Sequence, residues 1–143
     1  MKIAVIGAGS TYTPELVSGL GELDVGELAL MDIDEERLEI VGGLARRMWN
    51  GPLSLTGDLD RALDGADFVL LQIRVGGQAA RLRDETIPLA CGCIGQETTG
   101  AGGLGKALRT VPVVLGIAEK VRERAASDAW IVDFTNPVGI VTR

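Results

Sequence analysis

A glycine-bounded loop near the N-terminus is the first segment whose residue types could do chemistry. Gly7 and Gly9 follow a short apolar, β-branched run, and Ser10 and Thr11 lead into a predicted helix. This order suits a nucleotide pyrophosphate, because glycines let the backbone approach the phosphates and a helix N-terminus directs free N–H groups at an anion. Tyr12 replaces the third glycine of the dinucleotide fingerprint, so the pattern is incomplete. The loop predicts dinucleotide binding, and the alternative is a tight strand-to-helix turn without a ligand.

A carboxylate stands where a ribose would lie beside such a loop. Asp32 ends the second predicted strand, 25 residues after Gly7. A carboxylate at this place accepts hydrogen bonds from both ribose hydroxyls and repels a 2′-phosphate, which favours NAD over NADP as the cofactor. The alternative is a turn residue at a strand end, next to Asp34 as a helix cap.

Three arginines follow the fourth predicted strand, at the sheet edge where ligands of α/β proteins collect. Arg74 comes just after the strand, and Arg81 and Arg83 lie on the next segment. Guanidinium groups bind anions such as phosphate through two parallel hydrogen bonds. The arginines could clamp an anionic ligand, or they could be solvated surface residues that pair with Asp84 and Glu85.

Two further polar positions could bind the hydroxyl groups of a sugar. Glu97 lies in the glycine-rich polar segment 95–103, directly before a long predicted helix, and Asn136 follows the last predicted strand. A carboxylate accepts hydrogen bonds from hydroxyls, and an amide both donates and accepts them. The glycine-rich segment could also be a second anion site or a mobile lid without ligand contacts. Asn136 could serve a ribose, or it could belong to a simple Asn-Pro turn before a helix.

The elements that must position these residues alternate between strands and helices. Strands are predicted at Lys2–Ile6, Glu27–Met31, Leu53–Thr56, Asp67–Gln72 and Trp130–Phe134. Helices are predicted at Pro14–Leu20, Asp34–Trp49, Leu59–Leu63, around Gln78–Ala90, at Leu104–Arg124, and within Thr135–Arg143. We expect Thr13 to be the N-cap of the first helix and Pro112 to kink or break the long one. The strands are continuous apolar runs, which predicts burial on both faces and an α/β fold, a Rossmann-like doubly wound parallel sheet.

Composition narrows the class of protein. The 143 residues suffice for one domain, and the net charge of −6 with scattered basic residues excludes a nucleic-acid footprint. No apolar run approaches the roughly 20 residues that span a bilayer, and no signal peptide is evident, so we expect a cytoplasmic protein without a membrane partner. Cys91 and Cys93 lack the further ligands of a metal site and are expected to be small buried hydrophobes. The sequence contains no histidine, which removes the conventional Ser-His and Cys-His pairs.

Six collinear segments together carry a resemblance to a known family. They are Ile6–Leu16, Met31–Ile33 with Ile40–Gly42, Gln72–Gly76, Ile94–Gly100, Ala107–Val113 and Phe134–Pro137. The chain resembles, almost end to end, the N-terminal domain of the family-4 glycoside hydrolases, and most closely that of the 6-phospho-β-glucosidases among them. Tyr12 in the third glycine position is normal for this family.

The resemblance implies a hydrolysis that proceeds by oxidation, elimination and addition. In the family, bound NAD⁺ oxidises the sugar 3-hydroxyl by hydride abstraction, and a tyrosine base removes the acidified proton at carbon 2. The glycosidic oxygen is then eliminated, water adds, and the reduced cofactor returns its hydride. A divalent metal, usually manganese, polarises the 2- and 3-oxygens as a Lewis acid.

The resemblance also implies a role for individual residues of this chain. The residues that would hold NAD are Gly7, Gly9, Ser10, Thr11 and Asp32. Those that would bind the phosphorylated sugar are Arg74 and Arg83, as candidates for its 6-phosphate, with Glu97 and Asn136 on its hydroxyls.

The catalytic residues of the family are expected outside this chain. Family members are roughly three times this length in our expectation, because a second α/β domain accompanies the dinucleotide half. The metal-binding cysteine and histidine and the tyrosine base should lie beyond the equivalent of Arg143, and Tyr12 is the only tyrosine here. We therefore expect residues 1–143 to be one truncated dinucleotide-binding domain, inactive alone, whose exposed docking surface favours a homo-oligomer. A fragment of a lactate/malate-type dehydrogenase and a free-standing NAD-binding module are the alternatives.

Overall fold

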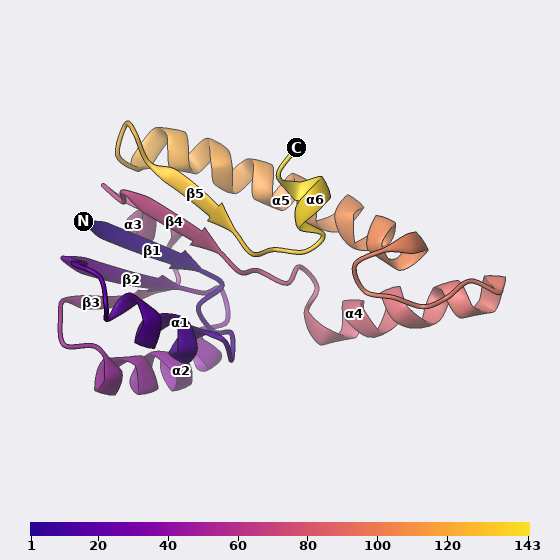
Figure 1. Ribbon diagram of the computed structural model, residues 1–143, viewed down its shortest axis with the longest axis horizontal. Helices are drawn as coiled ribbons and strands as arrows, with labels where there is room; N and C mark the ends of the chain where they lie inside the picture. The colour runs from indigo at the N-terminus through magenta and orange to yellow at the C-terminus, as the bar shows by residue number, and fades with distance from the viewer. The chain divides into compact units, whose positions relative to one another are not determined.

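Five strands form one sheet in the order β3-β2-β1-β4-β5 (Figure 1). The computed structural model describes residues 1–143, and its strands are β1 (Lys2–Ile6), β2 (Glu27–Met31), β3 (Leu53–Thr56), β4 (Phe68–Leu71) and β5 (Trp130–Asp133). β1 pairs in parallel with both β2 and β4, and β2 pairs in parallel with β3. The first strand is therefore central, and the strand order reverses beside it, where open α/β sheets bind their ligands. The Rossmann-like doubly wound fold is confirmed.

The chain divides into two compact units. The first comprises Met1–Ile73 with Glu119–Val132, and the second comprises Arg74–Ala118 with Asp133–Arg143. The helices are α1 (Thr13–Leu20), α2 (Glu35–Met48), α3 (Leu59–Leu63), α4 (Gly77–Thr86), α5 (Gly100–Arg124) and α6 (Val138–Val141), with a 3-10 helix η1 (Ile87–Cys91) after α4. The sheet with α1, α2 and α3 belongs to the first unit, and α4, η1 and most of α5 belong to the second.

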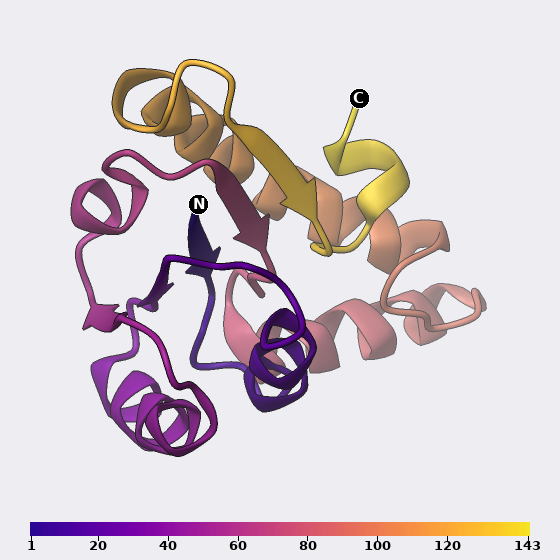
Figure 2. The ribbon, with the colours of Figure 1, turned by 60° about the vertical axis from the view of Figure 1, so that its left-hand side comes forward.

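Helices cover both faces of the sheet within the first unit. α1 and α2 pack side by side on one face, and α3 contacts β1 and β2 from the other (Figure 2). The last turns of α5 are joined to α3 by ion pairs, since Asp60 lies 2.9 Å from Arg124 and 3.4 Å from Lys120.

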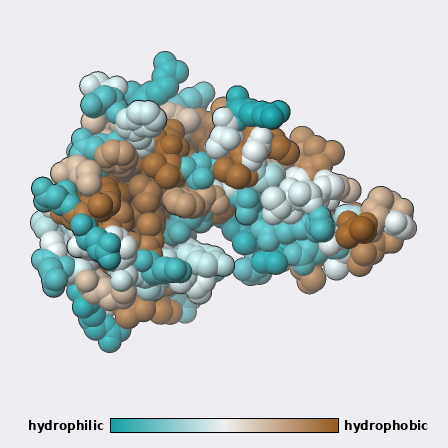
Figure 3. All heavy atoms as spheres, viewed as in Figure 1, coloured by the Kyte–Doolittle hydropathy of each residue, from teal (hydrophilic) through white to brown (hydrophobic).

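The three central strands carry the buried side chains of the sheet, and no residue of the two edge strands is fully buried. Val5, Leu28, Leu30 and Leu71 are fully buried, because helices cover both faces of these parallel strands. The expectation of full burial is wrong for β3 and β5, which are edge strands and are only partly covered. Trp130 in β5 is 68% exposed, and apolar side chains gather over the strands on the face seen in Figure 3.

Two helix starts test the predicted caps. Asp34 is the N-cap of α2, as predicted, and its carboxylate accepts a hydrogen bond from the Arg37 N–H at 3.1 Å. The expectation that Thr13 caps α1 is wrong, because Thr13 is the first residue of the helix and the cap position, Tyr12, makes no side-chain cap bond. The Thr13 side chain is instead fully buried, and its hydroxyl donates to the carbonyl of Ala8 at 2.8 Å.

The second unit differs from the sequence-based expectation in three places. α5 begins at Gly100 rather than at Leu104, and it continues through Pro112 without a break. Cys91 and Cys93 are exposed, so their predicted burial is wrong. They lie where η1 ends and Gly92, with a φ of 69°, turns the chain in the left-handed region, which leaves both side chains at the surface.

α5 has the length and composition of a membrane span, although no such segment was predicted from the sequence. One such helix is weak support for a membrane location, since core helices of soluble proteins meet the same criterion. α5 also contributes Ala107, Val114, Ile117 and Val121 to the buried apolar side chains.

Replacing Gly7 by alanine should destabilise the sheet, whereas the same change at Gly19 should not. Gly7 has a φ of +90°, and a Cβ on it would lie 2.7 Å from the backbone carbonyl oxygen of Gln72. We expect Gly7→Ala to lower the free energy of unfolding by about 2–3 kcal/mol, through backbone strain and this clash. Gly19 lies in α1 with nothing within 4 Å of an added Cβ, so Gly19→Ala should be neutral or stabilising by up to about 1 kcal/mol.

Urea unfolding of both variants, followed by circular dichroism, checks the pair. Equal unfolding midpoints for Gly7→Ala and the unchanged protein would show that the turn tolerates a side chain.

Candidate functional site

The glycine loop of the first unit is held by the ends of the two strands that flank β1. The backbone N–H groups of Gly7 and Ala8 both donate to the carbonyl of Met31, at 2.9 Å. On the other side, the Gln72 side-chain amide donates to the Thr13 hydroxyl at 2.7 Å and to the Gly7 carbonyl at 3.3 Å. The loop is therefore fixed in place without any ligand.

Asp32 lies directly against this loop. One oxygen of its carboxylate accepts the Gly9 N–H at 2.7 Å, and the other accepts the Asp34 N–H at 2.9 Å. A Cβ at position 9 would lie 2.9 Å from the Asp32 carboxylate, so glycine is needed for this close approach. Each carboxylate oxygen retains a lone pair that can accept a hydrogen bond from a hydroxyl.

The loop also keeps polar groups available at its exposed edge. The backbone N–H of Thr11 has no hydrogen-bond partner within the chain, and the Ser10 hydroxyl accepts only a long bond of 3.3 Å from the Tyr12 N–H. Tyr12 is 71% exposed, so its side chain is not buried in the loop. A free N–H, a hydroxyl and a carboxylate at the start of a helix fit the phosphates and ribose of a dinucleotide.

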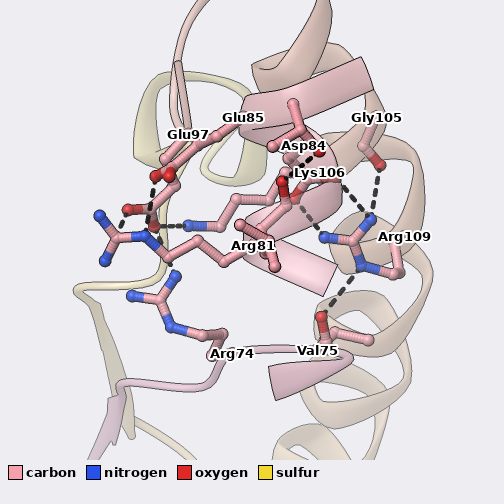
Figure 4. A network of polar contacts seen from close by, with 11 residues as sticks. Arg74, Val75, Arg81, Asp84, Glu85, Glu97, Gly105, Lys106 and Arg109 are labelled. Carbon is pink, nitrogen blue, oxygen red and sulfur yellow. Dashed lines mark hydrogen bonds and ion pairs between the residues drawn. The ribbon is translucent and has the colours of Figure 1, made fainter. Parts of the chain in front are cut away.

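In the second unit, three cationic side chains converge on Glu97 (Figure 4). Arg74 reaches one carboxylate oxygen of Glu97 at 2.7 Å, and Lys106 hydrogen-bonds to that same oxygen. Arg81 lies 3.4 Å from the second oxygen and also pairs with Glu85 at 2.9 Å. A concave surface of about 500 Å³ borders this cluster and is lined by Arg81, Glu85 and the segment 95–99.

These contacts keep Glu97 ionised. Burial raises the pKa of the Glu97 carboxyl, but hydrogen bonds from Lys106 and Arg74 and the attraction of their charges outweigh this effect and lower the pKa from 4.5 to about 2. At neutral pH the Glu97 side chain is thus a hydrogen-bond acceptor and not a proton donor.

A second ion pair fixes the backbone that carries Arg74. Both guanidinium Nη atoms of Arg109 donate to the Asp84 carboxylate, at 2.6 and 3.1 Å, and its Nε donates to the Val75 carbonyl at 3.0 Å. The hydrogen bond to Asp84 raises the pKa of Arg109 above its usual range. Arg109 therefore joins α5 to α4 and to the segment that follows β4.

The structure brings only some of the predicted substrate residues together. Arg74 and Glu97 are in direct contact, whereas Arg83 and Asn136 are exposed and hydrogen-bond to neither of them. Arg81, predicted as an alternative surface residue that pairs with Glu85, does make that pair.

A known family matches the chain almost end to end. The model described as "Family 4 glycosyl hydrolase" matches residues 2–143. The chain belongs to glycosyl hydrolase family 4.

Relatives in this family cover nearly the whole chain. A Bacillus subtilis (strain 168) protein named "Probable 6-phospho-beta-glucosidase" is 53% identical in an alignment that covers 99% of this chain and 34% of that protein. The 6-phospho-beta-glucosidase of Escherichia coli (strain K12) is 48% identical, with the same coverage. The solved structure of the Thermotoga maritima 6-phospho-beta glucosidase with NAD and glucose-6-phosphate superposes with a TM-score of 0.92 at 45% identity, covering 97% of this chain and 35% of that one. The chain thus spans about a third of the length of these family-4 relatives.

Sequence reasoning missed two residues of this family-4 chain. Lys106 was not singled out, and Asp84 was considered only as a partner of surface arginines. A signal was present for Lys106, because a lysine among the small and apolar residues of α5 interrupts the face that such a helix buries.

The structure places no group of three or more His, Cys, Asp or Glu side chains together that could hold a metal ion.

Removing the Arg109 guanidinium should destabilise the second unit. Arg109→Met leaves the Asp84 carboxylate, only 8% exposed, without its cation, and we expect a loss of about 3 kcal/mol in the free energy of unfolding. Arg124→Met is the matched control, since its pair with Asp60 is more than a third exposed on both sides and should contribute less than about 1 kcal/mol. Thermal unfolding of the two variants measures the difference, and equal losses would contradict a structural role for the Asp84–Arg109 pair.

Proposed function

We propose that this chain is the NAD-binding part of an NAD- and divalent-metal-dependent 6-phospho-β-glucosidase. The observation that carries the proposal is the contact between Gly9 and Asp32, which presents a carboxylate beside the phosphate-binding loop at the start of a helix. The relatives that are 44–53% identical support the β-linked substrate class, since they are named 6-phospho-beta-glucosidases, whereas relatives named for 6-phospho-α-glucosides are 32–38% identical. Membership of this family favours a glycosidase over a lactate/malate-type dehydrogenase and over a free-standing NAD-binding module.

The first unit would bind the cofactor. The pyrophosphate would lie against Gly7, Gly9, Ser10 and Thr11, where the Thr11 N–H is free, and the adenosine ribose would donate its hydroxyls to Asp32. The carboxylate would repel the 2′-phosphate of NADP, so NAD is the cofactor. When bound, NAD supplies the hydride acceptor for oxidation of a sugar carbon.

The second unit would bind the phosphorylated sugar. Arg74 and Arg83 are the candidates for the 6-phosphate, and Glu97 and Asn136 would contact hydroxyls. The exposed Arg83 side chain has no acidic partner, which leaves it available for a phosphate and supports its assignment. The concave surface supports Glu97 alone, since Arg74, Arg83 and Asn136 do not line it. Glu97, ionised at neutral pH, would accept a hydrogen bond from a sugar hydroxyl and so orient the ring.

Other parts of the proposal concern the longer protein. We propose that residues 1–143 are its dinucleotide-binding domain, and that the metal ligands for manganese and a tyrosine base lie in the region that matches the remaining two thirds of the relatives. A cytoplasmic location suits a charged cofactor and a charged sugar phosphate, neither of which crosses a bilayer freely. Homo-oligomer formation is supported by the exposed apolar side chains of β5, because such edges tend to be covered in assemblies.

Replacing Asp32 should weaken NAD⁺ binding and remove the preference for it over NADP⁺. Asp32→Ala loses a charged acceptor for two ribose hydroxyls, so we expect the Kd for NAD⁺ to rise tenfold or more. Asp24→Ala is the control, because Asp24 is exposed and has no assigned role. Titration calorimetry with each dinucleotide measures both effects. An unchanged Kd for NAD⁺ in Asp32→Ala would place the ribose elsewhere.

The full-length protein that carries this chain should cleave an aryl 6-phospho-β-glucoside only when NAD⁺ and Mn²⁺ are both present. The corresponding glucoside without phosphate should not be cleaved. Arg83→Met should raise the KM for the phosphorylated substrate about tenfold, through loss of a charge-assisted contact, and leave the affinity for NAD⁺ unchanged. Release of the aryl group after complete removal of NAD⁺ would reject the redox mechanism.

A further inference from the structure

Lys106 is a buried cation with a single partner. It lies on α5 with a side chain that is 6% exposed, and its ammonium group hydrogen-bonds only to Glu97. A buried ammonium without a counter-ion is strongly unfavourable, so the side chains of Lys106 and Glu97 depend on each other.

The other two cations that face Glu97 are of a different kind. The side chains of Arg74 and Arg81 are 33% and 42% exposed, and Arg81 already pairs with Glu85. Arg74 and Arg81 are closer to solvent than Lys106, so their pairs with Glu97 contribute less and can be exchanged at a smaller cost. Arg74 can therefore exchange Glu97 for the phosphate of a ligand. Lys106 has Glu97 as its single ionic partner and is expected to stay in place.

We infer that Lys106 is the positioning residue of Glu97, and that it keeps this carboxylate ionised and fixed in direction when Arg74 is drawn to an anionic ligand. The inference about the bound state rests on the proposed function, in which Arg74 is a candidate for the sugar phosphate. The inference about the free state rests on geometry alone.

The other charged groups around Glu97 are consistent with a fixed Lys106 and an exchangeable Arg74. Arg74 precedes α4, Arg81 and Glu85 lie on α4, and Lys106 lies on α5, so the net charge facing the carboxylate stays positive when Arg74 departs. The hydrogen bond from Lys106 is also the largest of the effects that lower the pKa of Glu97. A pinned, ionised carboxylate binds a hydroxyl in one orientation, which is what selection among sugar epimers requires.

Carbon-13 NMR of the Glu97 carboxyl, in the full-length protein that carries this chain, tests the inference for the protein without ligand. Glu97→Gln assigns the resonance, and its titration gives the pKa in the unchanged protein and in three variants. Lys106→Met should raise the pKa by at least one unit, a tenfold change in the dissociation constant, while Lys106→Arg should keep it low. Lys120→Met, on the same helix but paired with Asp60 and Glu123, is the matched control and should leave it unchanged.

The Arg74→Met variant distinguishes the effect of Arg74 on Glu97 from that of Lys106. It also keeps the inference testable if Lys106→Met does not fold. In Arg74→Met the Glu97 pKa should stay below 4.5, the ordinary value. A Glu97 pKa that is unchanged in Lys106→Met, or that rises in Arg74→Met to 4.5 or above, would overturn the inference.

The bound state is tested with glucose 6-phosphate at pH 5, in the same spectra. Saturation should leave the Glu97 resonance at its ionised position in the unchanged protein and move it toward the protonated position in Lys106→Met. Protonation of Glu97 on saturation in the unchanged protein would overturn the role of Lys106 in the bound state. Failure of glucose 6-phosphate to bind would count against the proposed function, while the titration without ligand still decides the role of Lys106 in the free state.

Discussion

The close approach of the β1–α1 turn to its two neighbouring strands is the constraint on which the first unit depends. Gly7 passes so near the Gln72 carbonyl that no side chain fits, and the Met31 carbonyl accepts two consecutive N–H groups of the turn. These contacts bind the ends of β2, β1 and β4 into one rigid edge. A loop held in this way needs little ordering when a ligand arrives, so the cost of binding is low.

Two ion pairs organise the polar side chains of the second unit. Arg109 and Lys106 lie one turn apart on α5, and each meets a carboxylate of its own, Asp84 and Glu97. In the Arg109–Asp84 pair, both guanidinium Nη atoms donate to the carboxylate, and the Nε bond to Val75 holds the backbone next to Arg74. The Lys106–Glu97 pair is also in contact with the partly exposed Arg74 and Arg81, and Glu97 lines a concave surface.

Much of the fold could be predicted from the sequence because local signals and tertiary packing agree there. The apolar runs of β1, β2 and β4 coincide with the buried strands, and Asp34 caps α2 as its position suggests. The errors arise where a residue type fits two environments. Thr13 looks like a helix cap, yet its hydroxyl is used inside the turn, and Cys91 looks like a core residue, yet it ends an exposed 3-10 helix. β5 has the apolar composition of a buried strand. Its burial, however, depends on which other elements cover that edge of the sheet, and the residues of β5 do not reveal this.

The candidate site was predictable in its residue types but not in its pairings. The sequence marks Arg74, which follows β4, and Glu97, in the glycine-rich segment before α5, as candidate polar positions, but only the path of α5 shows that Lys106 reaches the same carboxylate. This pairing decides what the site can do. An ionised Glu97 cannot donate a proton at neutral pH, the arginines do not release one, and the chain has no histidine. Under the proposed function, the groups on this chain would hold and orient a cofactor and a sugar, and the ionised Glu97 would accept a hydrogen bond rather than donate one.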